Sequence, residues 1–445
     1  MRRPFITLLA ANALSVTGTM LCVLAVPWFV LETTGSAALT GLAAFATTLP
    51  VVVSAAFGGT LVDRLGFRRA SVLSDLVSGV VVLAVPVLAA TSGLSYTVLL
   101  ALLFLRWLVA TPGETARKAM LPELAALGGV RIERAAAAYD GVYRGAAMAG
   151  APLAGVLIVW LGTDALLVVD GVSFVLSACL VGGGLPRAGG ADTGTDGRTD
   201  GRTDAGTGGG RDRYLSGLRD GLAFLWRDRL QLSATAMLVV VNMLDTGVTQ
   251  VLLALYARDV AGDPRAFGLL AGAVAAGALA GTAVYAAVGD RLPRRLTYGT
   301  AFLLAGVPRV LVLALGAPLP AAVAVAAASG FAAGAINPIL GVLQYDRIPP
   351  GLRARVIGAM TAAACAAMPV GGLLAGTLTT LAGLAPTLYA FTCGYLLISL
   401  PPFVGRAWRE LDRPGAIPGE RKPDRSGVPD RPGAVARARQ LRRAG

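Results

Sequence analysis

The chain carries two copies of one short charged turn, each at the point where a long apolar run ends. The copies read Gly59-Thr-Leu-Val-Asp63-Arg64-Leu-Gly66-Phe-Arg68-Arg69 and Gly289-Asp290-Arg291-Leu-Pro293-Arg294-Arg295. In each copy an acid and an arginine precede a turn-forming residue, and two arginines follow it. A repeated helix–basic turn–helix unit in an apolar chain predicts a membrane protein built from two equivalent halves, which is an organisation typical of transporters.

Composition supports this prediction, because the chain has too few charges to face water over most of its length. Of its residues, 55% are hydrophobic and 15% are charged, whereas a soluble globular domain carries about 25% charged residues. The 57 glycines are typical of closely packed membrane helices, in which small residues let two backbones approach. We therefore expect an all-α integral membrane protein with two pseudo-symmetric six-helix halves.

The residues that most enzymes and metal sites need are missing from the sequence. There is no histidine, and the four cysteines lie inside apolar runs at unrelated spacings, so we expect no metal site, disulfide or cofactor. Neither a phosphate-binding loop ending in Gly-Lys-Ser/Thr nor a Gly-x-Ser-x-Gly elbow is present. The net charge is +13, but most of the basic residues lie between the apolar runs and form no basic face with aromatic residues. Neither an enzyme nor a nucleic-acid partner is therefore expected.

Twelve segments are long enough to cross a bilayer, since a spanning helix needs roughly 20 apolar residues. They lie near residues 5–32, 37–62, 70–91, 95–113, 133–161, 165–184, 231–257, 266–289, 296–315, 318–344, 354–382 and 386–405. Between the sixth and the seventh, a Thr-Asp-Gly-Arg tandem indicates a flexible linker, and leucines at helical spacing indicate an amphipathic surface helix. The expected parts are an N-terminal half at 1–184, the linker with its helix at 185–230, a C-terminal half at 231–406 and a disordered tail at 407–445.

The distribution of basic residues predicts the orientation of the chain. All but five of the 39 lie in the N-terminal segment, alternate loops, the linker and the tail. The exceptions are Arg106, Arg144, Arg258, Arg265 and Arg309. Because positively charged loops stay in the cytoplasm, we expect both termini there, in a multi-pass protein of the cell membrane. The first apolar run lacks a small-residue cleavage site and is expected to be a span.

With these segments in view, the chain resembles the major facilitator superfamily over about residues 5–405. The segment 59–69 matches that family's signature between helices 2 and 3, Gly-x-Leu-x-Asp-Arg-x-Gly-x-Arg-Arg, at nearly every position. Three further stretches, at 26–36, 119–124 and 133–135, are similar to the macrolide-efflux and siderophore-export branch of its drug:proton antiporters. The resemblance implies the twelve-helix major facilitator fold and a monomer.

The resemblance also implies that Asp63 latches the cytoplasmic end of the first half against helix 11, whose start carries Arg353 and Arg355. The expected latch residues of the two turns are Gly59, Asp63, Arg64, Gly66, Arg68, Arg69, Asp290 and Arg291. A plain positive-inside anchor would explain the arginines but not an acid at a fixed place. In the second copy Pro293 replaces Gly66 with one residue fewer, which leaves its latch role open.

Glycine and proline in two spans predict hinges. Gly150-Ala-Pro152-Leu-Ala-Gly155 resembles the family's antiporter motif, Gly-Pro-x-x-Gly-Gly, with the proline displaced by one and one glycine missing. Met368-Pro369-Val-Gly371-Gly372 is a related sequence in the eleventh span. Both residue types bend membrane helices, which suits alternating access. The expected hinge residues are Gly150, Pro152, Gly155, Pro369, Gly371 and Gly372, although close helix packing alone would also require glycines.

Polar residues inside the spans are the candidate substrate and proton sites, since each is costly in lipid. Asp245 lies near the middle of span seven and shares a helix face with Asn242. A carboxylate at this depth in the membrane is suited to bind a proton or a cationic substrate. A hydrogen bond to a neighbouring helix is the alternative. Asn337 precedes a proline in span ten and could face the cavity.

Three other charges lie within spans. Arg106 is near the centre of span four, where the family often carries a functional arginine, and Asp75 is one possible partner. A structural ion pair is the rival interpretation of Arg106. Arg309 is expected to extend toward the membrane surface, and Asp170 has no obvious partner in the sequence.

These features favour proton-coupled export of an amphiphilic small molecule, such as a drug, a macrolide or a siderophore-like compound. Uptake of a polar metabolite is an alternative, but it would call for more polar and aromatic residues in spans 1, 4, 7 and 10 than this chain offers. A non-transporting membrane receptor or scaffold is a further alternative, because degenerate motifs would still fold. The expected partners are the substrate, protons and the lipid bilayer.

Overall fold

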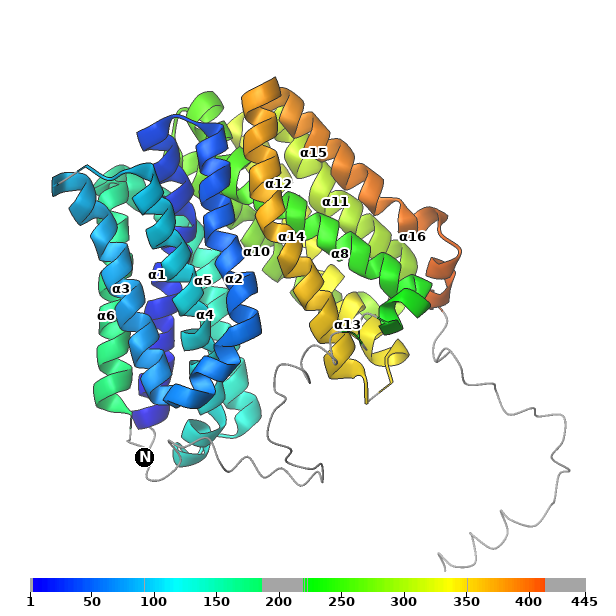
Figure 1. Cartoon of the computed structure of the whole chain (residues 1–445). Coiled ribbons are helices and arrows are strands. Elements are labelled where there is room, and N and C mark those ends of the chain that lie inside the picture. The colour runs from blue at the N-terminus through cyan, green and yellow to red at the C-terminus, as the bar shows by residue number, and fades with distance from the viewer. Residues whose placement is uncertain are drawn as a thin grey trace, which may run out of the picture.

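The computed structural model describes residues 3–91, 93–185, 219, 221, 223–349 and 351–412. Within these ranges the chain is a bundle of long helices in two halves (Figure 1). The helices of the first half are α1 (Arg3–Thr34), α2 (Ala37–Leu65), α3 (Phe67–Thr91), α4 (Tyr96–Leu127), α5 (Ile132–Leu161) and α6 (Thr163–Gly184). We call the end of the bundle where the N-terminus lies the near end, and the opposite end the far end.

The second half begins with a span of mixed helical type. It consists of α8 (Arg229–Gly247), the π-helical turn η1 (Val248–Leu252), α9 (Leu253–Tyr256) and the π-helical turn η2 (Ala257–Ala261). The other helices are α10 (Pro264–Val288), α11 (Arg294–Ala314), α12 (Leu319–Ala333), α13 (Ile336–Arg347), α14 (Arg353–Ala382), α15 (Leu384–Ser399) and α16 (Pro401–Val404). A short 3-10 turn, η3 (Gly289–Arg291), joins α10 to α11.

The predicted number of spans agrees with the structure. Eleven spans of the described chain are long and apolar enough to cross a membrane. The helix α5 supplies the twelfth, when its parts Ile132–Gly150 and Leu153–Leu161, which meet at 51°, count as one span. The expected all-α membrane fold is therefore confirmed.

The fourth span is longer than its hydropathy indicates. The apolar run stops near residue 113, but α4 continues to Leu127 and ends at Gly128 and Gly129, the latter with φ of +63°. Charged residues lower the hydropathy of this last part of the helix. One of them is Arg117, which is buried and ion-paired. Much of the loop expected at 114–134 is thus helix.

The predicted amphipathic helix is described only in part. Residues 223–227 are helical, with Leu225 buried among apolar side chains of the second half and Trp226 72% exposed. Contact of this helix with lipid stays a prediction. The Thr-Asp-Gly-Arg tandem lies outside the described residues.

The two halves meet closely through glycines at the far end. Gly41 of α2 faces Gly372 and Gly376 of α14, and a Cβ placed on Gly41 would lie 2.6 Å from the Gly372 carbonyl oxygen. On the other side of the bundle, a Cβ on Gly155 of α5 would lie 3.0 Å from the Cα of Gly268 in α10. Backbones at this separation leave no room for larger side chains. We call the contact between α2 and α14 the glycine seam.

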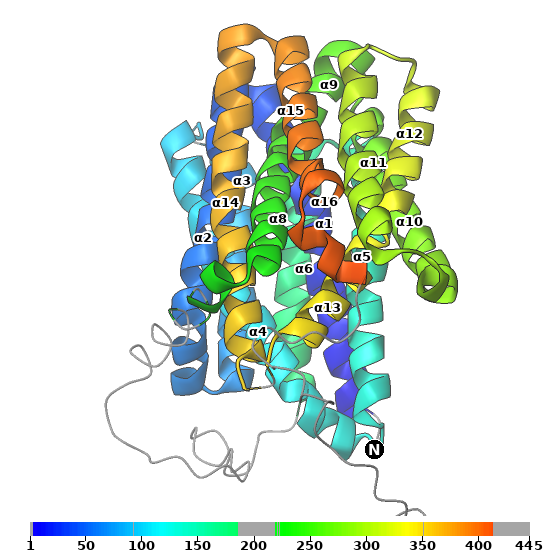
Figure 2. The same cartoon turned by 90° about the vertical axis from the view of Figure 1, so that its right-hand side faces the viewer.

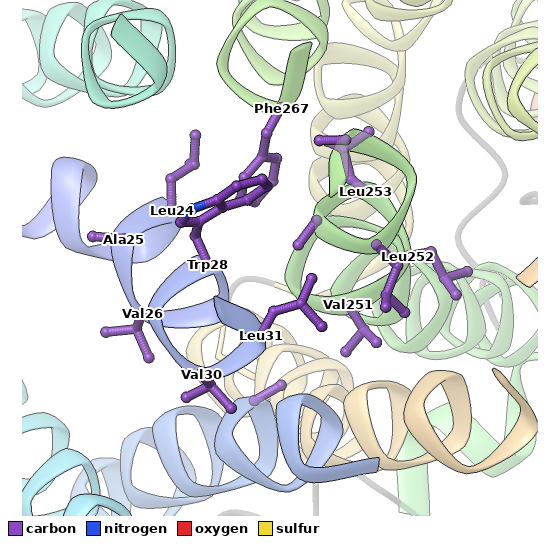
Figure 3. Packing of buried hydrophobic residues seen from close by; sticks show 14 of the residues in the cluster. Leu24, Ala25, Val26, Trp28, Val30, Leu31, Val251, Leu252, Leu253 and Phe267 are labelled. Carbon is purple, nitrogen blue, oxygen red and sulfur yellow. The ribbon is translucent and has the colours of Figure 1, made fainter. Parts of the chain in front are cut away.

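Apolar side chains fill the space between these two contacts. Trp28 and Leu31 of α1 belong to one buried cluster with Val251, Leu252 and Phe267 of the second half (Figure 3). The side chain of Arg258 adds a hydrogen bond across the halves, because its Nη1 donates to the Leu31 carbonyl oxygen at 3.3 Å. The far end of the bundle is therefore closed, and we call this cluster the far-end seal.

The chain after α16 does not begin as the disordered tail that the sequence predicts. Residues Ala407–Asp412 form a 3-10 helix, η4, which lies beside α11 (Figure 2). Trp408 in this helix is 1% exposed, stacks on Tyr298 with ring centroids 5.3 Å apart, and donates from Nε1 to Ser233 Oγ at 3.0 Å. Arg347 also reaches both Asp228 and Glu410, at 2.9 and 2.8 Å. Residues 413–445 lie outside the described ranges.

We expect Trp408→Ala to loosen this end of the second half, because truncating a buried tryptophan costs about 3–5 kcal/mol. The thermal unfolding midpoint of the purified protein should fall, and a protease should cut near residue 407 more rapidly. Trp226→Ala is the matched control, since Trp226 is 72% exposed. Equal unfolding midpoints for the two variants would contradict the burial of Trp408.

Candidate functional site

A cavity of about 370 Å³ lies against the inner face of the first half. Its wall is formed by α1, α2, α4, α5 and α6, and the second half contributes Gln250 and Met368. The exposed area is mainly apolar, with aromatic side chains from Trp107, Tyr143 and Phe174. This volume and this lining are typical of sites that bind small organic molecules.

The polar groups of the cavity come mostly from α1 and α4. Ser15 and Thr19 of α1 present hydroxyl groups, and Arg117 of α4 lies behind them. Glu114 is the one carboxylate among the described lining residues, and its Oε1 accepts a hydrogen bond from Lys118 at 2.7 Å. The sequence did not indicate this carboxylate, because the apolar run of the fourth span ends before residue 114. The continuation of α4 past the apolar run brings Glu114 into the wall.

The predicted partner of Arg106 is wrong. Asp75 of α3 instead pairs with Arg117, whose Nη1 donates to both carboxylate oxygens at 2.8 and 2.9 Å. Ser177 of α6 donates to the same carboxylate, and Arg117 Nη2 donates to Ser15 Oγ at 3.2 Å. Both charged side chains are less than 5% exposed. This pair joins α1, α3, α4 and α6 and ends at a hydroxyl of the cavity.

Arg106 pairs with Asp170 of α6, for which the sequence offered no partner. The Nη2 to Oδ2 distance is 3.2 Å, and both side chains are fully buried. The same Nη2 donates to Thr19 Oγ1 at 3.4 Å, and the guanidinium carbon lies 4.4 Å from the ring centroid of Trp107. Arg106 therefore sits behind the cavity wall and contacts Thr19 and Trp107, which line the cavity.

Asp245 is the centre of a cluster in the second half. Its Oδ1 accepts hydrogen bonds from Arg309 of α11 and from the hydroxyl of Tyr395 in α15, and Arg309 also donates to that hydroxyl at 2.8 Å. The expectation that Arg309 extends toward the membrane surface is thus wrong, since its side chain is 13% exposed. The Asp245 side chain remains 41% exposed. It does not line the cavity described above.

The other predicted polar residues do not join these clusters. Asn242 lies one turn before Asp245 and donates to the carbonyl oxygen of Leu238 in its own helix at 2.9 Å. Asn337 is exposed near the start of α13, after the break that follows α12. Neither residue lines the cavity.

The first charged turn lies at the near end, where α2 meets α3 (Figure 1), and its residues Asp63 and Arg64 are exposed. Neither of these two side chains forms a hydrogen bond or ion pair within the described residues. Arg353 donates to the carbonyl oxygens of Ile348 and Tyr345, not to Asp63. A latch between the halves is therefore not formed in this conformation and stays a prediction.

The two charged turns are used in the same way by the two halves. Arg68 donates to the Val181 and Gly182 carbonyl oxygens at the end of α6. Arg295 donates to the carbonyl oxygens of Pro402 and Phe403 in α16. The spacing from Asp63 to Arg68 equals that from Asp290 to Arg295. The second turn thus aligns with the first without a missing residue.

The remaining latch residues differ between the turns. Gly66 has φ of +79°, a value that favours glycine, whereas Pro293 at the matching position has φ of −67°. Asp290 and Arg291 are both exposed in the short turn before α11. Gly59 lies within α2 near its end, and Arg69 follows Arg68 in the first turn of α3.

The predicted hinge glycines are points of close helix contact. A Cβ on Gly150 would lie 2.6 Å from the Met20 Cβ of α1, and one on Gly371 would overlap the Met243 carbonyl oxygen of α8. The 51° bend in α5 falls between Gly150 and Leu153, and Pro152 lies within this break. Pro369 lies inside α14 near the glycine seam. Both packing and bending are thus present, and the hinge role itself stays a prediction.

Comparison with known proteins places these features in a family. The profile of the Major Facilitator Superfamily matches residues 235–443. The multidrug efflux pump Tap of Mycobacterium tuberculosis (strain ATCC 25618 / H37Rv) is 33% identical over 420 residues, which cover 92% of this chain and 95% of that protein. The multidrug efflux pump Tap of Mycolicibacterium fortuitum is also 33% identical, over 92% of this chain and 98% of its own.

Solved structures share the arrangement of helices at low sequence identity. The nucleoside transporter NupG superposes with a TM-score of 0.71 and 11% identity, over 90% of this chain and 98% of its own. A bacterial homologue of the human lysosomal transporter Spinster, in an inward-facing and unoccupied conformation, gives a TM-score of 0.65 and 14% identity over 92% and 96% of the two chains. At these identities the likeness shows the fold.

Proposed function

The chain belongs to the major facilitator superfamily, and from this premise we propose that it exports amphiphilic small molecules in exchange for protons. It is a secondary transporter and not an enzyme, and its matched relatives are multidrug efflux pumps. The cavity supports an amphiphilic substrate, because its exposed area is mainly apolar and its polar groups, most of them from α1 and α4, are few. Substrates of this kind include drugs, macrolides and siderophore-like compounds.

The observation that carries this proposal is the unequal closure of the two ends. The far-end seal and the glycine seam close one end, whereas the latch residues Asp63 and Arg64 at the other end are exposed and without partners in the described chain. Alternating access requires that the two ends close in turn. In the opposite state Asp63 would reach the start of α14 and the hinge glycines would let the helices rearrange.

We place both termini in the cytoplasm and the protein in the cell membrane, because all but five of the 39 basic residues lie in the terminal segments, the linker and alternate loops of the sequence. The structure then corresponds to an inward-open state. A monomer suffices for this function, since one chain supplies both halves and the cavity between them.

Asp245 is the proposed proton carrier. Its carboxylate is partly exposed and holds Arg309 of α11 and Tyr395 of α15. Protonation would remove the negative charge and weaken the hold on Arg309. The contacts among α8, α11 and α15 would then change with each proton bound or released, which is the requirement for coupling a proton gradient to a conformational change.

Drug accumulation in cells that lack their own efflux pumps tests this function. Cells that express the protein should accumulate less of a macrolide or a cationic dye, and a protonophore should abolish the difference. Asp245→Asn should abolish the export while leaving the protein in the membrane, because the asparagine amide cannot bind and release a proton as the carboxylate does. Asp346→Asn is the matched control, since Asp346 forms an exposed ion pair with Arg294 at 3.3 Å.

Several outcomes would contradict the proposal. Protonophore-resistant export would exclude the proton coupling but not the transport. Increased accumulation would favour the alternative of an importer. A receptor or scaffold would be favoured if accumulation of every compound were unchanged although the protein is confirmed in the membrane, and if Asp245→Asn also left accumulation unchanged.

A further inference from the structure

The charges of the cavity wall are not equally available to a ligand. Arg117 is 4% exposed, and its positive charge is neutralised by Asp75, which accepts two short hydrogen bonds from it. Glu114 is 39% exposed, and its one ion-pair partner among the described residues is Lys118, whose own side chain is 56% exposed. An exposed pair at this i, i+4 spacing contributes about 0.3–0.5 kcal/mol. The Glu114 carboxylate can therefore exchange Lys118 for another cation at little cost.

The surroundings of Glu114 match an organic cation better than a neutral or anionic ligand. Thr111 and Trp107 lie on the same face of α4, one and two turns before it, and Tyr143 lines the same cavity from α5. Met20 and Met368 add polarisable thioethers from two other helices. Aromatic faces attract cations, and the attraction grows when the cation has left water. An anion would meet the Glu114 carboxylate as a like charge.

A second arginine sets the geometry of this aromatic wall. The guanidinium carbon of Arg106 lies 4.4 Å from the ring centroid of Trp107 and 5.2 Å from that of Phe174. Because Arg106 is anchored by the fully buried Asp170, the two rings rest against a fixed group. A fixed wall keeps a bound ligand in one position relative to Glu114.

We propose that Glu114 is the specificity-determining residue of the cavity and that it selects lipophilic organic cations. The carboxylate binds the charged centre of the substrate, and the aromatic and methionine side chains bind its apolar groups. Binding displaces Lys118, which then returns to the solvent. This inference rests on the proposed export through the same cavity and names the substrate class of that function.

Equilibrium binding of radiolabelled tetraphenylphosphonium to the whole protein in lipid nanodiscs tests the inference. Glu114→Gln should weaken the binding about tenfold or more, the loss expected when one charge-assisted contact is removed. Lys118→Gln should strengthen it by about twofold, since it frees the carboxylate from its pair. Glu114→Asp should retain part of the affinity. Binding of chloramphenicol, a neutral amphiphile, should be the same for the wild type and Glu114→Gln.

Glu123→Gln is the matched control, because Glu123 is exposed on α4 and does not line the cavity. The inference is overturned if the wild type does not bind the cation, or if Glu114→Gln binds it unchanged. It is also overturned if Glu123→Gln weakens binding equally, or if Glu114→Gln loses the neutral ligand too. Drug export by a protein that fails these tests would leave the proposed function standing. Glu114-dependent binding without any export would refute the function and keep the site.

Discussion

Gly376→Leu is expected to abolish transport while the protein still reaches the membrane. A Cβ at Gly376 would lie 2.6 Å from the Ala37 carbonyl oxygen and 3.0 Å from the Gly41 Cα, so a leucine there forces α2 and α14 apart. Each half keeps its own packing, and only the closure of the far end is lost. The variant should therefore be arrested with the far end open.

Labelling of an introduced cysteine measures this arrest. Leu31→Cys places a thiol in the far-end seal, where Leu31 is 1% exposed. In a background without the native cysteines, a membrane-impermeant maleimide added to intact cells should label this thiol rapidly only when Gly376→Leu is also present. Gly358→Leu on the same helix is the control, because a Cβ at Gly358 meets no atom within 4 Å. Slow labelling together with normal transport in Gly376→Leu would show that the glycine seam is not required for closure.

Asp75→Ala is expected to destabilise the first half severely. The change leaves the buried Arg117 guanidinium without its counter-charge, a situation that costs about 3–5 kcal/mol. The thermal unfolding midpoint and the yield of folded protein should both fall. Asp346→Ala, which breaks the exposed pair with Arg294, should cost about 0–1 kcal/mol.

A double variant separates the stability of this pair from its function. Replacing both partners, as in Asp75→Leu with Arg117→Met, should restore most of the lost stability, because a buried ion pair can often be replaced by apolar side chains. If transport also recovers, the pair serves folding alone. If stability recovers without transport, the contact from Arg117 to Ser15 at the cavity contributes to function. Wild-type stability in Asp75→Ala would contradict the burial of the pair.

Hydropathy and the charged turns predicted the fold, because lipid requires long apolar helices and leaves a simple periodic signal. The same signal failed where a charge is buried by pairing. Arg117 and Glu114 come after the apolar run of α4, so the sequence predicted that they lie in a loop. Arg117 is instead buried, and Glu114 lines the cavity. The rotation of each helix about its axis decides such cases, and a single sequence does not give it.

Partners across helices were equally beyond the sequence. The sequence offered Asp75 as a possible partner of Arg106 and none for Asp170, because the pairing depends on which faces α3 and α6 turn toward α4. Arg309 follows a proline toward the far end of its span, a position typical of a side chain that reaches the membrane surface. It turns inward because Asp245 and Tyr395 lie on the adjacent helices.

The matching hydrogen bonds of Arg68 and Arg295 have a mechanical consequence. Each arginine ties the beginning of the third helix of its half to the end of the last, so each half is braced from within. A rocking motion then breaks contacts between the halves and leaves these braces untouched. In the alternating access proposed above, each half would then move as a rigid body. An insertion between the acid and the arginine of either turn would remove these hydrogen bonds and so loosen that half.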